Sequence, residues 1–209
     1  ISSIEKHLNQ LKRNKYSNAA ALNKIYIAFE KLLEYPWSVS IFYPNENVYG
    51  TRRALRAKLK LYRPGRDIVD NDMKHFSTAI ASGVLANLKA LNLNYNMIRD
   101  DGLKAFSEAC AKGAMASLAE LHLTSNQIGD PGVSALADAC TKGGLPQLWQ
   151  LYLGSNRIGD LGIISLVNSL GTGGLPNCTI LNIDNNPARA PIIKAFDSLM
   201  KWKRDHLTS

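Results

Sequence analysis

Few residues of this 209-residue sequence have a type and spacing that could support catalysis or metal binding. The four histidines are scattered, and none belongs to an HExxH motif or to a Cys/His cluster with the spacing of a metal site. A triad of Ser134, Asp138 and His122 can be assembled on paper, but any chain of this size offers such sets. The sequence therefore predicts a protein that is not an enzyme and that needs no cofactor or metal ion.

A basic segment is the strongest electrostatic feature of the chain. The net charge of +8 is concentrated in residues 1–70, which hold thirteen Lys and Arg against six Asp and Glu. Such a run could neutralise phosphates of a nucleic acid, meet an anionic protein partner, or form a solvated basic edge. No nucleic-acid-binding motif accompanies it. Its seven cations, with no acid between them, are Arg52, Arg53, Arg56, Lys58, Lys60, Arg63 and Arg66.

The three cysteines bear on the compartment. Cys110, Cys140 and Cys178 form no CxxC pair, and an odd number of thiols does not suggest a disulfide framework, so a reducing, intracellular compartment is expected. The chain begins at Ile1 without an initiator Met, which leaves room for a removed targeting segment and for either the cytoplasm or an organelle interior. No apolar run approaches the length of about 18 residues that a membrane span needs.

A thirty-residue internal period organises most of the chain. Three similar ten-residue segments recur at this interval: LNLNYNMIRD from Leu91, LHLTSNQIGD from Leu121 and LYLGSNRIGD from Leu151. Within each segment two leucines stand two positions apart, as on one face of a strand, and an Asn follows three positions later. The Asn amide can pair backbone groups where the chain turns away from the strand, so we expect a structural Asn column: Asn96, Asn126, Asn156 and Asn186.

The second half of each unit predicts a helix. Asp100, Asp130 and Asp160 stand where helices need N-caps, and apolar residues then follow at helical spacing. Glycines end the predicted helices at positions that recur with the same period: Gly113, Gly143 and Gly173. Each unit is therefore predicted to contain a strand, an Asn turn, a helix and a glycine stop.

Three copies of LxxLxLxxNxI, beginning at Leu88, Leu118 and Leu148, resemble a leucine-rich repeat of the ribonuclease-inhibitor-like subtype over about residues 57–200. The resemblance implies an α/β solenoid, a short right-handed horseshoe with a parallel sheet on its concave face and helices on its convex face. It also implies a binding partner that is another protein.

The ends of the chain depart from the repeat. Residues 1–56 lack it and predict a mainly helical extension that is either a cap of the solenoid or a separate docking element. Residues 57–189 would hold the repeats, the first of them stretched by two residues, and residues 190–209 a C-terminal capping helix and tail with Phe196, Met200 and Trp202 among its apolar residues.

Strand residues between the leucines should line the concave face, and these vary from repeat to repeat while the leucines do not. A surface of this kind suits protein recognition by a few aromatic anchors. The expected protein-binding residues are Asn92, Asn94, His122, Thr124, Tyr152, Asn182 and Asp184, with Trp149 at the margin.

The sequence thus favours a non-enzymatic protein-binding module, most concretely a scaffold, accessory or assembly subunit of a larger complex. One alternative is a protein that contacts RNA or a ribonucleoprotein through residues 52–66. A second alternative is a regulator of a signalling enzyme such as a small GTPase, as some proteins with this type of repeat are.

Overall fold

A computed structural model describes residues 59–62, 65, 67–81 and 85–207. The predicted extension at residues 1–56 and the basic residues Arg52, Arg53, Arg56, Lys58, Arg63 and Arg66 lie outside this part. Strands and helices alternate through it: β1 (Leu59–Tyr62), α3 (Asp70–Ala81), β2 (Leu88–Asn92), α4 (Asp100–Ala111), β3 (Glu120–His122), α5 (Asp130–Thr141), β4 (Gln150–Tyr152), α6 (Asp160–Gly171), β5 (Ile180–Asn182) and α7 (Ala190–Leu207).

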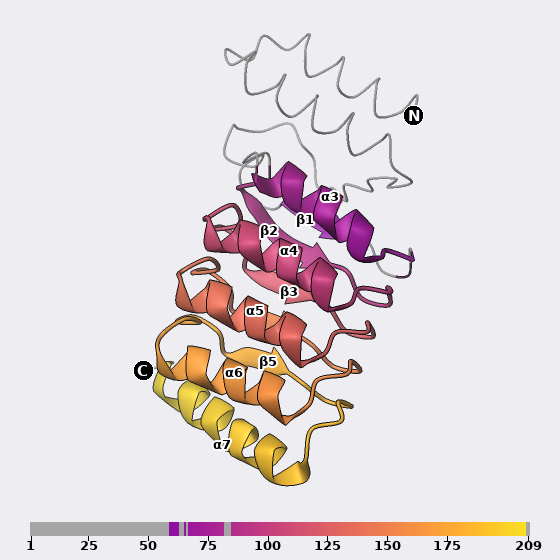
Figure 1. Ribbon diagram of the computed structural model, residues 1–209. Helices are drawn as coiled ribbons and strands as arrows, with labels where there is room; N and C mark the ends of the chain where they lie inside the picture. Colours follow the sequence, from indigo (N-terminus) through magenta and orange to yellow (C-terminus); the bar gives the residue numbers. More distant parts are fainter. Residues whose placement is uncertain (1–58, 63–64, 66, 82–84, 208–209) are drawn as a thin grey trace, which may run out of the picture. The chain divides into compact units, whose positions relative to one another are not determined.

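The five strands form one parallel sheet in the order β1-β2-β3-β4-β5. Each strand is followed by a helix that crosses back to the start of the next strand, and the helices form a layer in front of the sheet in Figure 1. The register advances by one sequence period per strand, so that Leu91 faces Leu121 and Leu121 faces Leu151. This is the predicted α/β leucine-rich-repeat solenoid.

The core lies between the two layers. Two leucines of each repeat, one in the strand and one directly after it, point towards the helices. These leucines (Leu91 and Leu93, Leu121 and Leu123, Leu151 and Leu153) are at most 1% exposed, as are Ile98, Ile128 and Ile158 after the turns. Cys178, which replaces the first leucine of the last unit, is also buried. Because the same slots are apolar in every unit, stacking the units produces one continuous core.

The predicted Asn column is a hydrogen-bond ladder that joins neighbouring repeats. The Asn126 amide oxygen accepts from the Ile98 backbone N–H at 3.0 Å, and the amide nitrogen donates to the carbonyls of Leu93 at 2.9 Å and Leu123 at 3.0 Å. Asn156 and Asn186 make the same three contacts in the next two repeats. The ladder satisfies backbone groups inside the turn, so its role is structural.

A second ladder corrects the prediction that Asp100, Asp130 and Asp160 are N-caps of their own helices. Each is the first helical residue, and the N-cap positions Arg99, Gly129 and Gly159 make no side-chain capping bond. The aspartates instead cap the next repeat. Oδ1 of Asp100 accepts from the N–H groups of Gly129 at 2.7 Å and Gly132 at 3.1 Å, as Oδ1 of Asp70 does from the corresponding groups one repeat earlier. A carboxylate at the positive end of the neighbouring helix is favourable for the same reason as an N-cap.

Gly132 and its equivalents make room for this second ladder. A Cβ on Gly132 would lie 2.8 Å from Oδ1 and 3.1 Å from Cα of Asp100, and Gly102 and Gly162 face Asp70 and Asp130 in the same way.

The predicted glycine stops are confirmed as well. Gly113, Gly143 and Gly173 have φ near +80°, a left-handed conformation in which a Cβ is unfavourable.

The first repeat keeps the register of the others, which corrects the expectation of a two-residue stretch. Leu61 faces Leu91 and Tyr62 faces Asn92, and the only shift falls between Leu59 and Lys60 at the start of β1. After the turn, the Ile68 N–H donates to the Asn96 amide at 3.1 Å, as Ile98 does to Asn126. The neighbouring strand therefore sets this register even though the first turn contains no Asn.

The last helix, α7, has 18 residues, whereas α3 to α6 have 12 each. Phe196 and Met200 are buried, as expected for an apolar face that closes the core. Trp202 is 59% exposed and stacks on His206 with ring centroids 4.5 Å apart. Trp202 therefore lies outside the core to which Phe196 and Met200 belong.

Candidate protein-binding surface

The predicted binding residues of β2 to β5 form a row across the sheet. Strand pairing sets Asn92 beside His122, His122 beside Tyr152, and Tyr152 beside Asn182. All four are partly exposed, whereas the leucine that precedes each of them is buried. We call these four residues the concave row. The structure thus brings together predicted residues from four strands that are far apart in the chain.

A stacked pair of rings occupies the middle of the concave row. The rings of His122 and Tyr152 lie with centroids 4.6 Å apart and planes inclined by 17°. Nε2 of His122 is also 3.8 Å from a carboxylate oxygen of Glu120, two residues earlier on β3. The pair therefore presents a stacked, partly exposed aromatic surface.

The two ends of the row differ in chemistry. At one end the Asn94 amide oxygen accepts from the Thr124 N–H at 2.7 Å, and the Asn94 N–H donates to the Asn92 amide oxygen at 3.0 Å. The amide oxygens of Asn94 and Asn92 therefore already accept hydrogen bonds from backbone N–H groups. At the other end the Asn182 amide donates to the exposed carboxylate of Asp184. That end presents an acid to solvent.

Gly154 shapes the acidic end. A Cβ at Gly154 would lie 2.6 Å from the Asn182 amide oxygen, so the glycine leaves the space that this amide occupies.

Trp149 lies beside the row rather than in it. It directly precedes β4, is 39% exposed, and donates its backbone N–H to the Ala119 carbonyl at 3.0 Å.

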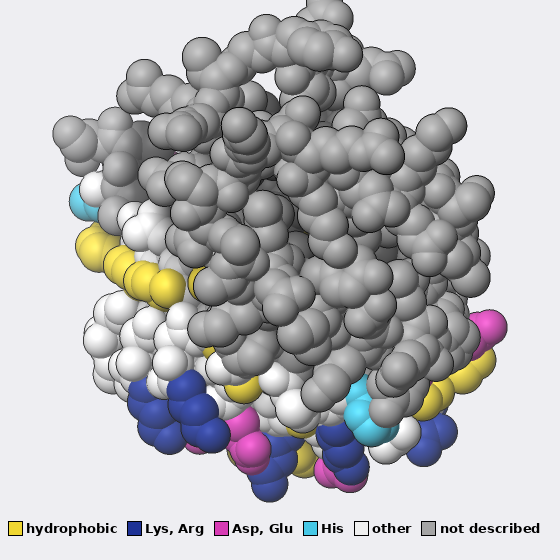
Figure 2. Space-filling view, turned by 90° about the horizontal axis from the view of Figure 1, so that it is seen from above, with side chains coloured by type: hydrophobic (Ala, Val, Ile, Leu, Met, Phe, Trp, Pro, Cys, Tyr) yellow, Lys and Arg dark blue, Asp and Glu magenta, His cyan; other side chains and the backbone are white. Residues whose placement is uncertain are grey.

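Of the seven cations of the predicted basic segment, the structure describes only the backbone of Lys60, which pairs with Ala90 on β2. The helical side of the repeats carries both signs of charge. Lys and Arg side chains alternate with Asp and Glu side chains along the lower rim of Figure 2, and Lys74 lies 3.9 Å from the carboxylate of Asp101.

The three thiols are buried, as expected of apolar core residues. Burial raises the pKa of Cys140 and of Cys178 to about 12, and it raises the pKa of Cys110 further. Thiols in this state are poor nucleophiles and poor metal ligands. Within the described residues, no group of three or more His, Cys, Asp or Glu side chains could hold a metal ion.

Sequence reasoning missed a polar cluster where the strands turn into the helices. Arg99 Nε and Arg157 Nη2 both donate to the Gln127 side-chain oxygen, each at 3.2 Å. These residues come from three successive turns and occupy two different positions of the repeating unit. The sequence did contain a signal for this cluster. The positions of these three residues lie next to the constant Asn and Ile columns, and the residue type at each position changes from repeat to repeat.

No helix in the described part of the chain is both long and apolar enough to cross a membrane.

Comparisons with known proteins agree with the repeat architecture. The family model for the leucine-rich repeat matches residues 84–107, 114–137 and 148–167. No curated protein sequence matches the chain. Among solved structures, actin-binding site 2 of leiomodin-1 is 15% identical with a TM-score of 0.51, and the match covers 71% of this chain and 82% of that one. An internalin from Listeria monocytogenes is 18% identical, but its TM-score is only 0.22 over 69% of this chain and 59% of its own.

The likeness to leiomodin-1 shows a shared fold and no more, because the identity is low. Leucine-rich-repeat domains generally mediate protein–protein interactions. The matched segments each contain one strand and most of the helix that follows it, in agreement with the sheet register and the two ladders. The described part of this chain is a leucine-rich-repeat solenoid.

Proposed function

We propose that this chain is a protein-binding module that holds its partner on the concave row, and that it serves as a scaffold or accessory subunit of a larger complex. The stacked pair of His122 and Tyr152 is the observation that carries this proposal. Rigid aromatic side chains bury a large area on binding and lose little conformational entropy, so they often supply most of the binding energy of an interface.

The contrast between buried and exposed positions supports the same conclusion. Along β3 and β4 the residues that face the helices are leucines in both repeats, and their role is packing. The residue that faces away changes from His122 to Tyr152. Architecture does not require this variation, so it is available for recognition of one partner.

Two finer assignments belong to this proposal. We assign the repeats to the ribonuclease-inhibitor-like subtype, because every described unit from α3 to α6 carries a helix of 12 residues. We also assign α7 to a C-terminal cap. Its outward positions carry Lys194, Asp197 and Lys201, all exposed, where the equivalent positions one repeat earlier on α6 hold Ile164, Val167 and Gly171. A charged outer side suits the end of a solenoid.

A photo-crosslinking amino acid placed at Asn182 tests the proposed surface, and the same group at the exposed Ser198 on α7 is the matched control. In the native source we expect a discrete protein adduct from position 182 and none from position 198. The adduct should disappear in the His122→Ala/Tyr152→Ala variant. Equal adducts from both positions, or an adduct that survives the double substitution, would contradict the proposal.

A further inference from the structure

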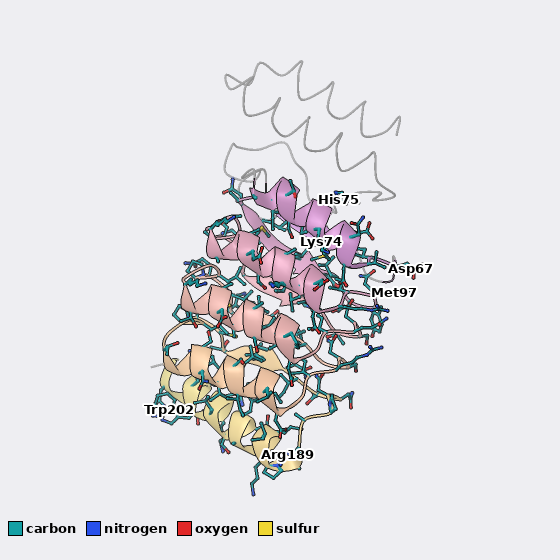
Figure 3. All side chains as sticks on the ribbon, viewed as in Figure 1. Asp67, Lys74, His75, Met97, Arg189 and Trp202 are labelled. Atoms are coloured by element: carbon teal, nitrogen blue, oxygen red, sulfur yellow. The ribbon has the colours of Figure 1, made fainter. Side chains whose placement is uncertain are left out.

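The turns that lead from each strand to the following helix stack on one another and form one edge of the solenoid. We call it the turn edge, and it is the edge meant below. Backbone hydrogen bonds join the turns: the Met97 N–H donates to the Ile68 carbonyl, the Gln127 N–H to the Ile98 carbonyl and the Arg157 N–H to the Ile128 carbonyl, at 2.8–2.9 Å. Met97, Gln127 and Arg157 therefore form one column with a side chain from each of three repeats. Figure 3 shows Met97 and Arg189 on this edge, on the opposite side of the helix layer from Trp202.

Two cations converge on one neutral atom in this edge. The Gln127 side-chain oxygen accepts from Arg99 Nε and from Arg157 Nη2, each at 3.2 Å. Both arginines are exposed at the surface. Each guanidinium carries several further N–H donors, so most of its hydrogen-bonding capacity remains for a ligand.

The neighbouring described acids form no salt bridge with this pair. Oδ1 of Asp100 and Oδ1 of Asp130 accept from backbone N–H groups of the next repeat. Within the described residues, no carboxylate lies within 4.0 Å of a side-chain nitrogen of Arg99 or Arg157.

Another described arginine of the edge provides a comparison. Arg189 occupies the same position in its unit as Arg99 and forms a salt bridge with Asp160. Among the described residues, the edge thus contains one arginine that is paired with a carboxylate and two that share an amide oxygen.

Apolar side chains border the arginine pair on one side. Val69, Tyr95 and Met97 are 40%, 65% and 45% exposed, and all three belong to the first two turns of the edge. Met97 stands next to Gln127 in the column described above. Exposed apolar groups beside cations that form no salt bridge with a described carboxylate match a ligand that carries both an acid and an apolar side chain.

We propose that Arg99, Gln127 and Arg157 form a carboxylate clamp for an acidic peptide segment of a partner protein, and that an apolar residue of this segment packs on Met97. A carboxylate accepts from two guanidiniums at once, and such charge-assisted bonds are stronger than those to a neutral amide. A bound carboxylate would therefore displace the amide oxygen of Gln127 from its shared position.

Exposed acidic residues elsewhere on this edge favour a short acidic peptide over a polyanion as the ligand. Asp67 is exposed on the same edge, and the side chain of Asp101, in the first turn of α4, is 74% exposed. A nucleic acid that ran along the edge would bring its phosphates close to these carboxylates. A single peptide carboxylate at the clamp avoids them.

The test uses the full chain, a phage library of random short peptides, and three variants. We expect the wild-type chain to enrich peptides with an Asp or Glu close to an apolar residue. Synthetic copies of these peptides should bind at least about tenfold more weakly to Arg99→Gln/Arg157→Gln, which lacks both cations, and to Gln127→Glu, which places a carboxylate between them. The control Lys194→Gln removes one exposed cation from α7 and should bind like the wild type.

Other outcomes would overturn the proposal. These are the absence of acidic and apolar peptides among those enriched, or equal binding by the double variant and the control. Equal binding of peptides in which Gln replaces the acid would exclude a carboxylate clamp. A short single-stranded oligonucleotide that competes with the peptides, and whose own binding requires both arginines, would replace the peptide with nucleic acid as the ligand.

Discussion

The Asn ladder and the concave row are both polar, and both cross the sheet from one repeat to the next, but they behave in opposite ways. The ladder repeats one residue type, and Asn96, Asn126 and Asn156 are at most 8% exposed. The concave row changes at every strand and stays partly exposed. A buried amide must satisfy fixed backbone groups, and this requirement is the same in every repeat. A partly exposed side chain has no such requirement.

In this solenoid, therefore, a repeated polar residue indicates architecture, whereas a polar position that varies is available for function. The Asp ladder extends the rule, because Asp70, Asp100, Asp130 and Asp160 are also invariant and bind backbone N–H groups of the next repeat. Substitutions in the ladders should reduce stability, and substitutions in the concave row should reduce partner binding.

The largest effect is expected for Asn156→Ala. It removes four hydrogen bonds and leaves the buried Ile128 N–H without its acceptor. The Leu123 and Leu153 carbonyls each keep one amide donor, from Asn126 and Asn186. The free energy of unfolding should fall by about 3 kcal/mol, since an unsatisfied buried N–H costs about 1–3 kcal/mol and each other lost hydrogen bond about 0.5–1.5 kcal/mol. Urea denaturation measures this loss. Asn168→Ala, at an exposed position of α6, is the control and should change stability by less than about 0.5 kcal/mol.

A somewhat smaller effect is expected for Gly132→Ala. The new Cβ would lie 2.8 Å from Asp100 Oδ1, so the carboxylate or the helix must shift, at a cost of about 1–3 kcal/mol. Gly171→Ala is the matched control, because a Cβ there has no neighbour within 4 Å. The control should be neutral or stabilising by up to about 1 kcal/mol. If both variants were stabilised in thermal unfolding, Gly132 would not be making room for the Asp ladder.

A pH-dependent effect is expected at Asp160. The Arg189 backbone N–H, followed by the Arg189 side chain, lowers the pKa of this carboxyl below its ordinary value of 3.8. A lowered folded-state pKa stabilises the fold above the ordinary value, and this contribution is lost as pH falls through the folded-state pKa. The melting temperature of Asp160→Asn should therefore lie below that of the wild type near neutral pH, and the gap should close below about pH 4. Asp138→Asn, on the exposed side of α5, controls for the loss of one charge. A gap that widens in acid would refute the assignment.

The smallest effect on stability is expected for His122→Ala/Tyr152→Ala. Both side chains are partly exposed, so the double substitution should lower the free energy of unfolding by about 1 kcal/mol or less. The same variant should lose the crosslink from position 182. A loss of stability as large as that of Asn156→Ala would assign the stacked rings to architecture and remove the distinction between ladder and row.

Several features of the fold could be predicted because they depend on local periodicity. Leu121 and Leu123 share a face because strand residues alternate, and Gly143 ends a helix because few other residues adopt its φ of +78°. The role of Asp100 could not be predicted in the same way. A carboxylate at the start of a helix can cap its own helix or the next one, and both arrangements place Asp at nearly the same position. The glycine column through Gly132 was the available signal, since a glycine two residues after Asp100, Asp130 and Asp160 implies close approach by another chain segment.

The site shows the same division. The sequence predicts that His122 and Tyr152 share a face, because both follow a core leucine by one residue. Their stacking depends on the register of β3 against β4, and it also depends on rotamers that no pattern encodes. The convergence of Arg99 and Arg157 on Gln127 arises between turns, so no single repeat contains it.

The sequence alone predicts the repeat and its period, the apolar core positions and the Asn ladder. The reason is that an apolar side chain or an amide in the same local geometry packs or forms hydrogen bonds in the same way in every repeat. Tertiary packing was needed to establish which helix each Asp caps, where the first repeat begins, and which variable side chains meet. Those contacts join residues of neighbouring repeats, and their geometry follows from the stacking of one repeat on the next.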